Sequence, residues 1–230
     1  MSEQLLPISA QDVYDAAGNI KGAVIRTPTN HSRTLSEITG ADVHLKFEIF
    51  QFTAAYKERG ALNRLLSLPE GTKGVIAASA GNHAQGISYH AGRLGIPATI
   101  VMPKGTPFNK VKRTEELGAR VVLTGANFEE ATKAAYALAD KESLTFIHPF
   151  DDPLVMAGQG TVGLEMLEDV PDLETLIVPI GGGGLISGIA TVAKAINPNI
   201  RIVGVQTEAF PAMKEAMDGS SLAGSNISIA

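Results

Sequence analysis

The sequence predicts an α/β fold in which parallel, twisted sheets carry helices on both faces. Apolar segments of strand length recur along the chain, and helical patterns occupy the gaps between most of them. Segments such as 74–78 and 98–102 are continuously apolar and do not alternate with polar residues. Continuous apolar strands separated by helices are typical of parallel sheets that are buried on both faces.

The order of the elements follows from these patterns. Ser9 is expected to cap a first helix, because Asp12 occupies the capping-box position and an apolar stripe follows. Further helices are expected at 56–66, 83–94, 108–117, 128–141 and 185–196. Strands are expected at 43–47, 74–78, 98–102, 119–123, 144–147, 175–180 and 200–205. Ligands of such folds bind beyond the carboxyl ends of strands, so the loops there are the places to search for function.

Composition limits the possible functions. The chain has 230 residues, a net charge of −5 and no cysteine or tryptophan. Hydrophobic residues make up 44% and charged residues 19%, which fits a globular protein of one or two domains. The acidic balance gives no electrostatic reason to bind nucleic acid. Without cysteine there are no disulfides, thiolate metal sites or cysteine nucleophile.

The sequence predicts neither export nor a membrane span. The first eleven residues lack the basic and apolar regions of a signal peptide, so a cytoplasmic location is expected. Residues 175–193 carry no charge and approach the length of a membrane-spanning helix. Pro179 and a run of glycines interrupt this stretch, which is therefore interpreted as a buried strand, a loop and a helix.

Four consecutive glycines, Gly181, Gly182, Gly183 and Gly184, follow the strand that ends at Ile180 and precede Leu185. Four glycines cost about 2–4 kcal/mol of backbone entropy, so a compensating interaction is expected. Exposed N–H groups that lead into a helix can bind phosphate. The spacing fits neither a dinucleotide fingerprint nor a P-loop, which favours a small monophosphate. A flexible turn without a ligand is the alternative.

The loop Ser79–Gly86 follows the strand 74–78 and contains small residues around Asn82. An asparagine can cap a helix, and the helix N-terminus then suits an anion such as a carboxylate. The alternative is that Asn82 only caps its helix and that His83 only packs against it.

The loop Thr53–Ala61 contains Lys57. If Thr53 caps the following helix, Lys57 falls in its first turns, where the helix dipole disfavours the ammonium form and favours a nucleophilic amine. Such an amine can form a Schiff base with an aldehyde. The alternative is a surface lysine beside Glu58. Taken together, the three loops fit a cofactor with both a phosphate and an aldehyde, as in pyridoxal phosphate.

In these three loops, the sequence resembles the fold-type II pyridoxal-phosphate enzymes. Within that family, it is most similar to the group of threonine dehydratases and serine racemases. The resemblance also includes His148–Asp151 and Gly158–Thr161 and covers nearly the whole chain. It implies that Lys57 binds the cofactor covalently and acts as the catalytic base. It also implies that the cofactor is bound by Asn82, Gly181, Gly182, Gly183, Gly184 and Leu185. The substrate carboxylate would be surrounded by Ser79, Ala80, Gly81, Asn82 and His83.

The resemblance also implies a domain division and a reaction. A small domain at 53–148 would be inserted in a large, cofactor-binding domain made of 1–52 and 149–230, which is expected to be incomplete at its C-terminal end. The reaction would be deamination of L-threonine or L-serine to a 2-oxo acid and ammonia, in a homo-oligomer. Alternatives are a serine racemase, a cysteine synthase-like β-replacement enzyme and a truncated inactive subunit.

Two positions depart from relatives within the group. Racemases of the group carry a serine where this chain has Ala80, which has no proton to donate, so a dehydratase is favoured. Some members bind a divalent cation through a glutamate at the position of Gln206, so no metal is expected here.

Overall fold

The computed structural model describes residues 6–209 and 211–219, so the outermost parts of the predicted large domain lie outside the described residues. Helix α1 (Ala10–Ile20) begins at the predicted capping box. The Ser9 hydroxyl accepts a hydrogen bond from the Asp12 N–H, and the Asp12 carboxylate accepts one from the Ser9 N–H at 2.7 Å. Val13, Ala16 and Ile20 form the buried face of this helix, which confirms the predicted start and stripe.

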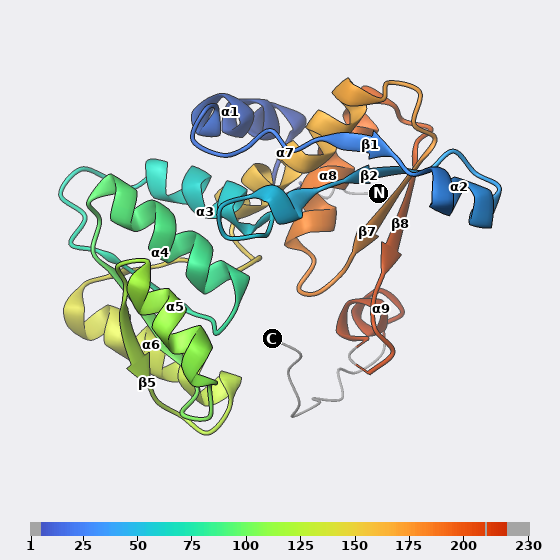
Figure 1. Ribbon diagram of the computed structural model, residues 1–230. Helices are drawn as coiled ribbons and strands as arrows, with labels where there is room; N and C mark the ends of the chain where they lie inside the picture. Colours follow the sequence, from blue (N-terminus) through green and yellow to red (C-terminus); the bar gives the residue numbers. More distant parts are fainter. Residues whose placement is uncertain (1–5, 210, 220–230) are drawn as a thin grey trace.

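A four-stranded parallel sheet is formed by the middle of the chain, between residues 75 and 146 (Figure 1). Its strand order is β5-β4-β3-β6, with bounds β3 (Val75–Ala78), β4 (Ala98–Met102), β5 (Arg120–Leu123) and β6 (Thr145–Phe146). The connecting helices are α4 (Asn82–Leu94), α5 (Phe108–Glu116) and α6 (Phe128–Glu142). These elements match the sequence-based expectation to within a few residues.

Helices cover both faces of this sheet, as predicted. Val75 and Ala77 pack in one cluster with apolar residues of α4, whereas Ile76 and Ala78 pack on the opposite face against the alanines of α6. Because successive side chains of a strand point to opposite faces, two buried faces require the continuous apolar runs seen in the sequence.

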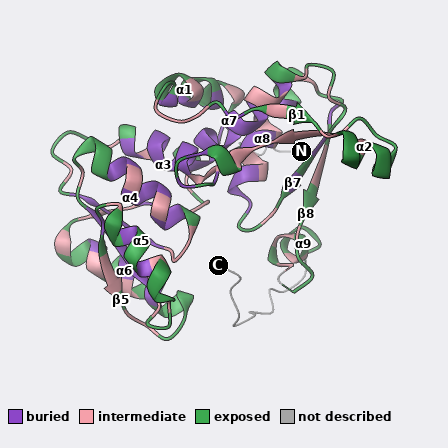
Figure 2. Ribbon diagram, in the orientation of Figure 1, coloured by how far each residue is buried: buried purple, intermediate pink, exposed green. Residues whose placement is uncertain are grey.

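The second parallel sheet pairs β7 (Thr175–Pro179) with β8 (Arg201–Val205), and α8 (Gly184–Ile196) connects them. Leu176 and Val178 are buried against α8, but Ile177 is 70% exposed and Val205 is 53% exposed. Within the described part of the chain, helices therefore cover only one face of this sheet. Exposed and buried residues alternate along β7, and Figure 2 shows that no residue of β8 is fully buried.

Helix α7 (Pro153–Asp169) is the central helix of the molecule and was not predicted from the sequence. Its residues 155–164 are all buried, so it lacks the amphipathic period that reveals a surface helix. Figure 1 shows α7 beside α8 and near α3 (Lys57–Leu66). Glycines make these contacts possible: a Cβ on Gly158 would lie 2.6 Å from Gly60 Cα of α3. Gly160 and Gly188 bring α7 and α8 together in the same way.

The remaining described elements flank this core. The predicted strand at 43–47 is the shorter β2 (His44–Lys46), which pairs antiparallel with β1 (Thr29–His31). The other elements are α2 (Arg33–Thr39), the 3-10 helix η1 (Glu48–Phe50) and α9 (Ala212–Met217). Helix α3 packs on both α4 and α7, so it connects the four-stranded sheet with the part of the molecule that contains α7 and α8. The domain boundaries at 53 and 148 stay a prediction. No helix among the described residues has the length and apolarity needed to cross a bilayer.

Candidate functional site

Lys57 is the first residue of α3. The predicted cap is wrong: the N-cap residue is Tyr56, whose side chain makes no capping hydrogen bond. The backbone N–H of Thr53 instead donates to the carboxylate of Glu58, which is fully buried and lies next to Lys57 in sequence. The loop before the helix is thus closed by a side chain of the helix itself, and this places the Lys57 backbone.

The amine of Lys57 is partly buried and donates a hydrogen bond to the Pro149 carbonyl at 2.7 Å. Burial lowers the pKa of the Lys57 amine from its ordinary value to about 8. At pH 7 about one amine in ten is then neutral, against roughly one in 2,500 for an ordinary lysine. From the sequence, the helix dipole is expected to lower the pKa of Lys57. In the folded chain, burial of the amine lowers this pKa instead.

The predicted carboxylate loop lies close to Lys57. Helix α4 begins at Asn82, but the N-cap is Gly81, so the expected capping by the Asn82 side chain is wrong. Asn82 is exposed, and Gly81 donates its N–H to the Ser79 hydroxyl at 3.2 Å. Further along α4, a Cβ on Gly86 would meet the backbone of Lys57 and Glu58 at 3.4 Å.

His83 is a buried, neutral group beside Lys57. Its Nε2 lies 3.2 Å from the Ile147 carbonyl, and its Nδ1 has no hydrogen-bond partner within the described structure. Burial, together with the nearby charge of Lys57, lowers the pKa of His83 to about 3. The buried Nδ1 can therefore still form a hydrogen bond with a ligand at this site.

The glycine loop leads directly into α8, as predicted. Gly183 is the N-cap with φ of 91°, and Gly184 is the first residue of the helix. The first N–H groups of a helix have no acceptor within the helix and carry its positive dipole end. Leu185 buries its side chain in the core, so only its backbone is free to bind a ligand.

Packing explains most of these glycines. A Cβ on Gly182 would collide with the Phe150 ring, and one on Gly184 would lie 2.7 Å from the Phe150 carbonyl oxygen. At Gly183 the positive φ itself favours glycine. Gly181 is exposed, has open space around its Cα, and accepts a hydrogen bond from Gln206 Nε2 at 3.4 Å. Close packing and backbone conformation therefore require glycine at 182–184, whereas nothing in the packing requires it at Gly181.

The segment His148–Asp152 joins all these parts. Pro149 accepts from Lys57, Phe150 packs on the glycine loop, and Asp152 caps α7. Asp152 also forms an ion pair with Arg64 of α3 at 2.9 Å. The structure thus gathers Lys57 and the start of α8 around this segment, and His83 at the start of α4 contacts Ile147 directly before it. His148–Asp151 is part of the resemblance, but no role for its residues can be predicted from the sequence, because a carbonyl acceptor and a packed ring have no sequence signature of their own.

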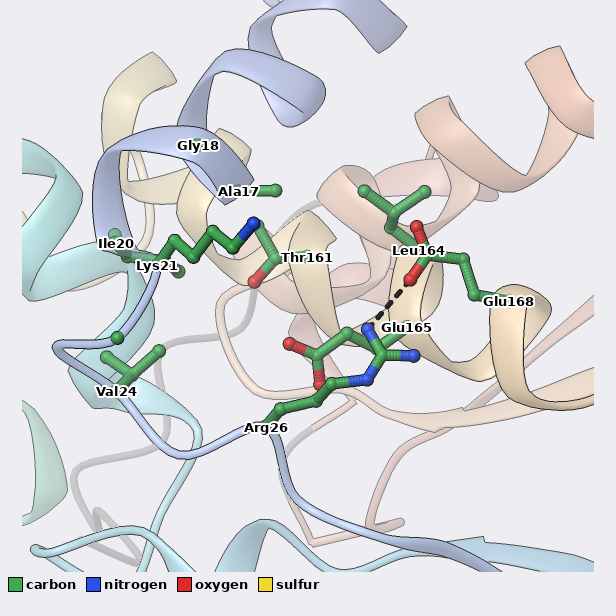
Figure 3. A pocket seen from close by; sticks show the side chains of 11 residues that line it. Ala17, Gly18, Ile20, Lys21, Val24, Arg26, Thr161, Leu164, Glu165 and Glu168 are labelled. Carbon is green, nitrogen blue, oxygen red and sulfur yellow. Dashed lines mark hydrogen bonds and ion pairs between the residues drawn. The ribbon is translucent and has the colours of Figure 1, made fainter.

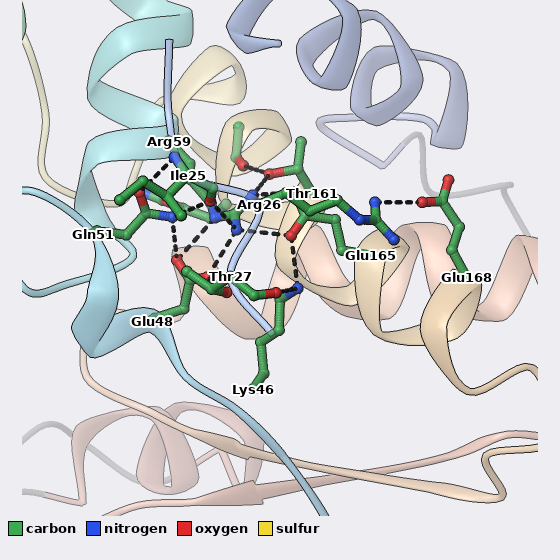
Figure 4. A network of polar contacts seen from close by, with 12 residues as sticks. Ile25, Arg26, Thr27, Lys46, Glu48, Gln51, Arg59, Thr161, Glu165 and Glu168 are labelled. Atoms are coloured by element: carbon green, nitrogen blue, oxygen red, sulfur yellow. Dashed lines mark hydrogen bonds and ion pairs between the residues drawn. The ribbon is translucent and has the colours of Figure 1, made fainter. Parts of the chain in front are cut away.

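Two other features do not include the predicted site residues. A cavity of about 350 Å³ opens between the end of α1 and α7, and Figure 3 shows its lining; no predicted site residue lines it. The second feature is a buried ion network around Arg59 (Figure 4). Arg59 pairs with Glu48 and Glu165, each at 2.7 Å, and Lys46 also pairs with Glu165 at 2.7 Å. No group of three or more potential metal ligands occurs in residues 6–209 and 211–219.

The residues present fit a phosphorylated aldehyde cofactor. Lys57 offers an amine whose neutral form is accessible, the glycine loop offers unpaired N–H groups, and His83 offers an orphaned nitrogen. Fold and site together define an α/β protein of the kind that binds such a cofactor at a helix N-terminus.

The comparisons agree with this class. The model of the family described as "Pyridoxal-phosphate dependent enzyme" matches residues 20–227, and the chain belongs to this family. The L-threonine ammonia-lyase of Thermotoga maritima is 50% identical over 208 residues, which are 90% of this chain and 52% of that protein.

Solved structures give the same result. Threonine deaminase isoform 2 from Solanum lycopersicum superposes with a TM-score of 0.87 at 40% identity, covering 91% of this chain and 59% of that one. Maize serine racemase superposes with a TM-score of 0.91 at 35% identity, covering 96% of this chain and 68% of that one. The chain spans about half the length of the first curated relatives it matches.

Proposed function

We propose that this chain carries the cofactor site of an ammonia-lyase that converts L-threonine or L-serine to a 2-oxo acid and ammonia. The observation that supports the proposal most directly is the Lys57 amine, partly buried and hydrogen-bonded to Pro149, beside the segment that packs on the glycine loop. The relatives named threonine ammonia-lyase and threonine deaminase favour this reaction. Homo-oligomeric assembly and a cytoplasmic location remain predictions.

The proposed residue roles follow from chemistry. Bound pyridoxal phosphate supplies an aldehyde that reacts with amines and a ring that delocalises charge from the substrate Cα. Lys57 Nζ would hold the cofactor and later accept the Cα proton, which requires the neutral amine that burial makes accessible. Backbone N–H groups of Gly181–Leu185 would bind the phosphate.

The start of α4 would bind the substrate and orient the ring. Ser79, Gly81, Asn82 and His83 lie where β3 passes into α4. The N–H groups of Asn82 and His83, in the first turn of the helix, suit a carboxylate, whereas those of Ser79 and Gly81 already donate to the Val101 carbonyl and the Ser79 hydroxyl. Asn82 is proposed to donate to the ring 3′-oxygen. Ala80, half-buried against the core, has no group that transfers a proton. Without an acid on the second face of the substrate, deamination is favoured over racemisation.

Cofactor binding is tested with the purified chain and pyridoxal phosphate. We expect a visible absorbance band that borohydride removes and that Lys57→Ala lacks. Lys110→Ala, which changes a lysine of α5 outside the site, is the matched control and should keep the band. An unchanged band in Lys57→Ala would contradict the proposed role of Lys57.

The reaction is tested separately by product. 2-Oxobutanoate from threonine or pyruvate from serine would support the deaminase. D-serine as the main product would favour a racemase, and sulfide-dependent turnover that exceeds deamination would favour β-replacement. Cofactor binding without any turnover would agree with an inactive subunit.

A further inference from the structure

His148 occupies a position that no role has been assigned to. Its Nδ1 accepts the backbone N–H of Asp151 at 2.8 Å, and the N–H of Phe150 lies 3.4 Å from the same atom. Its ring also packs edge-on against the Phe150 ring, with centroids 4.6 Å apart. One imidazole thus closes the turn made by residues 148–151.

This turn contacts two parts of the proposed cofactor site. The Pro149 carbonyl in the turn accepts the hydrogen bond of Lys57. The Phe150 ring occupies the space that a Cβ on Gly182 would need, and the Phe150 backbone does the same at Gly184. A change in the turn therefore moves the acceptor of Lys57 and the support of the glycine loop together.

We propose that His148 is a positioning residue whose unprotonated Nδ1 holds the 148–151 turn against Lys57 and the glycine loop. The inference rests on the proposed function, because the significance of the turn depends on Lys57 and the glycine loop binding the cofactor. An accepting Nδ1 requires the neutral imidazole with its proton on Nε2, since an imidazolium has donors at both nitrogens.

The charges around His148 define the relevant pH range. Burial lowers the pKa of His148, opposed by Asp151 and Asp152 and assisted by Lys57. Asp152 is itself paired with Arg64. His83 of α4 also faces this region, but with a pKa of about 3 it stays neutral above pH 5. Loss of the turn through protonation is therefore expected below the ordinary histidine pKa of about 6.5 and is assigned to His148.

The first test observes the imidazole directly in the 230-residue chain without cofactor. Two-bond ¹H–¹⁵N correlation spectra assign the proton of each ring nitrogen. We expect the His148 signal to show an unprotonated Nδ1 at pH 7.5 and to change as the pH falls towards 5. A proton on Nδ1 at pH 7.5 would overturn the proposal, whether or not the protein binds pyridoxal phosphate.

The second test compares His148→Ala with His148→Asn, because the asparagine oxygen lies close to where Nδ1 stood. The dissociation constant of pyridoxal phosphate is measured by absorbance titration at pH 7.5 and 5.5. His148→Ala should weaken binding about tenfold at pH 7.5, the effect of losing roughly one hydrogen bond, and His148→Asn should stay within about threefold of the original chain. At a pH where the spectra show that His148 is protonated, the original chain should lose at least about threefold more affinity than His148→Asn does, because asparagine does not titrate.

The outcomes separate the two proposals. If the unsubstituted chain does not bind the cofactor, the proposed function fails and the tautomer measurement still decides the role of the imidazole. If the chain binds but both variants equal it in affinity and pH profile, only the positioning role of His148 is overturned. If His148→Ala does not fold, the pH profile of His148→Asn and the spectra still decide.

Discussion

Lys57 shows how a single side chain acquires its chemistry from its surroundings. It has one hydrogen-bond acceptor, the Pro149 carbonyl, and no carboxylate pairs with its amine in the described structure. Because burial without a counter-charge penalises the ammonium form, the pKa falls to about 8. The same burial that makes the amine reactive therefore costs folding free energy while the amine is charged.

This cost predicts the effect of Lys57→Met on stability. Between pH 8 and 10.5 the unfolded chain binds more protons than the folded one, so the free energy of unfolding rises with pH in this window. Methionine has similar bulk and no charge, and we expect it to raise the free energy of unfolding at pH 7 by about 1–3 kcal/mol, after loss of one hydrogen bond. Urea unfolding at pH 7 and pH 10 measures both values. An equal rise with pH in the variant would show that another group causes it.

At the scale of elements, the glycine loop and its helix are held by close contact with Phe150. A methyl group on Gly182 has no space, whereas one on Gly181 meets nothing within 4 Å. Gly182→Ala should therefore destabilise the chain by about 1–3 kcal/mol and weaken cofactor binding. Gly181→Ala is the matched control and should change stability by less than about 1 kcal/mol. Thermal unfolding and cofactor titration check this, and equal effects of the two substitutions would contradict it.

Glycines also decide how α7 packs against α3. A Cβ on Gly158 would lie 2.6–2.8 Å from backbone atoms of Gly60 and Arg59, which cannot rotate away. Gly158→Ala should destabilise by about 3 kcal/mol or more, because the helices must separate. Gly18→Ala in α1, where nothing lies within 4 Å, should instead stabilise by about 0.5–1 kcal/mol through helix propensity. In denaturant unfolding, we expect Gly158→Ala to lower the free energy of unfolding and Gly18→Ala to raise it.

At the scale of the whole molecule, the network around Arg59 joins segments that are distant in sequence. Arg59 of α3 binds Glu48, next to β2, and Glu165 of α7. Burial would raise the pKa of Glu48, but hydrogen bonds and charge from Arg59 outweigh it and hold the pKa below 4.5. The guanidinium thus compensates two carboxylates that lie on different elements.

Arg59→Met is expected to lower the free energy of unfolding by about 3–5 kcal/mol at pH 7, since both carboxylates lose their partner. The contribution from Glu48 is present above its unfolded pKa and is lost as the pH falls through the lowered folded value. The difference between variant and original chain should therefore shrink from pH 7 to pH 4. Arg33→Met, which changes an exposed pair within α2, is the control with little expected effect. A difference independent of pH would contradict the role given to Glu48.

The sequence alone indicated much of this molecule because its signals are local. Ser9 with Asp12 predicts a helix start, apolar runs predict buried parallel strands, and Gly181–Gly184 predicts a loop that leads into a helix. Each signal depends on residues within a few positions of one another, so it can be recognised from the local spacing of apolar, capping and glycine residues. Helix α7 could not be predicted in this way, because a helix that is buried on all sides lacks the alternation of apolar and polar faces that marks a surface helix.

The sequence by itself determined the fold class, the family and the three loops that hold the candidate site. Only the tertiary structure decided which atoms meet there: the Pro149 carbonyl with Lys57, the Phe150 ring with Gly182, and Glu58 rather than Thr53 at the start of α3. It also decided that burial lowers the pKa of Lys57. The reason is that desolvation and close packing depend on groups brought from distant positions, which no local pattern records.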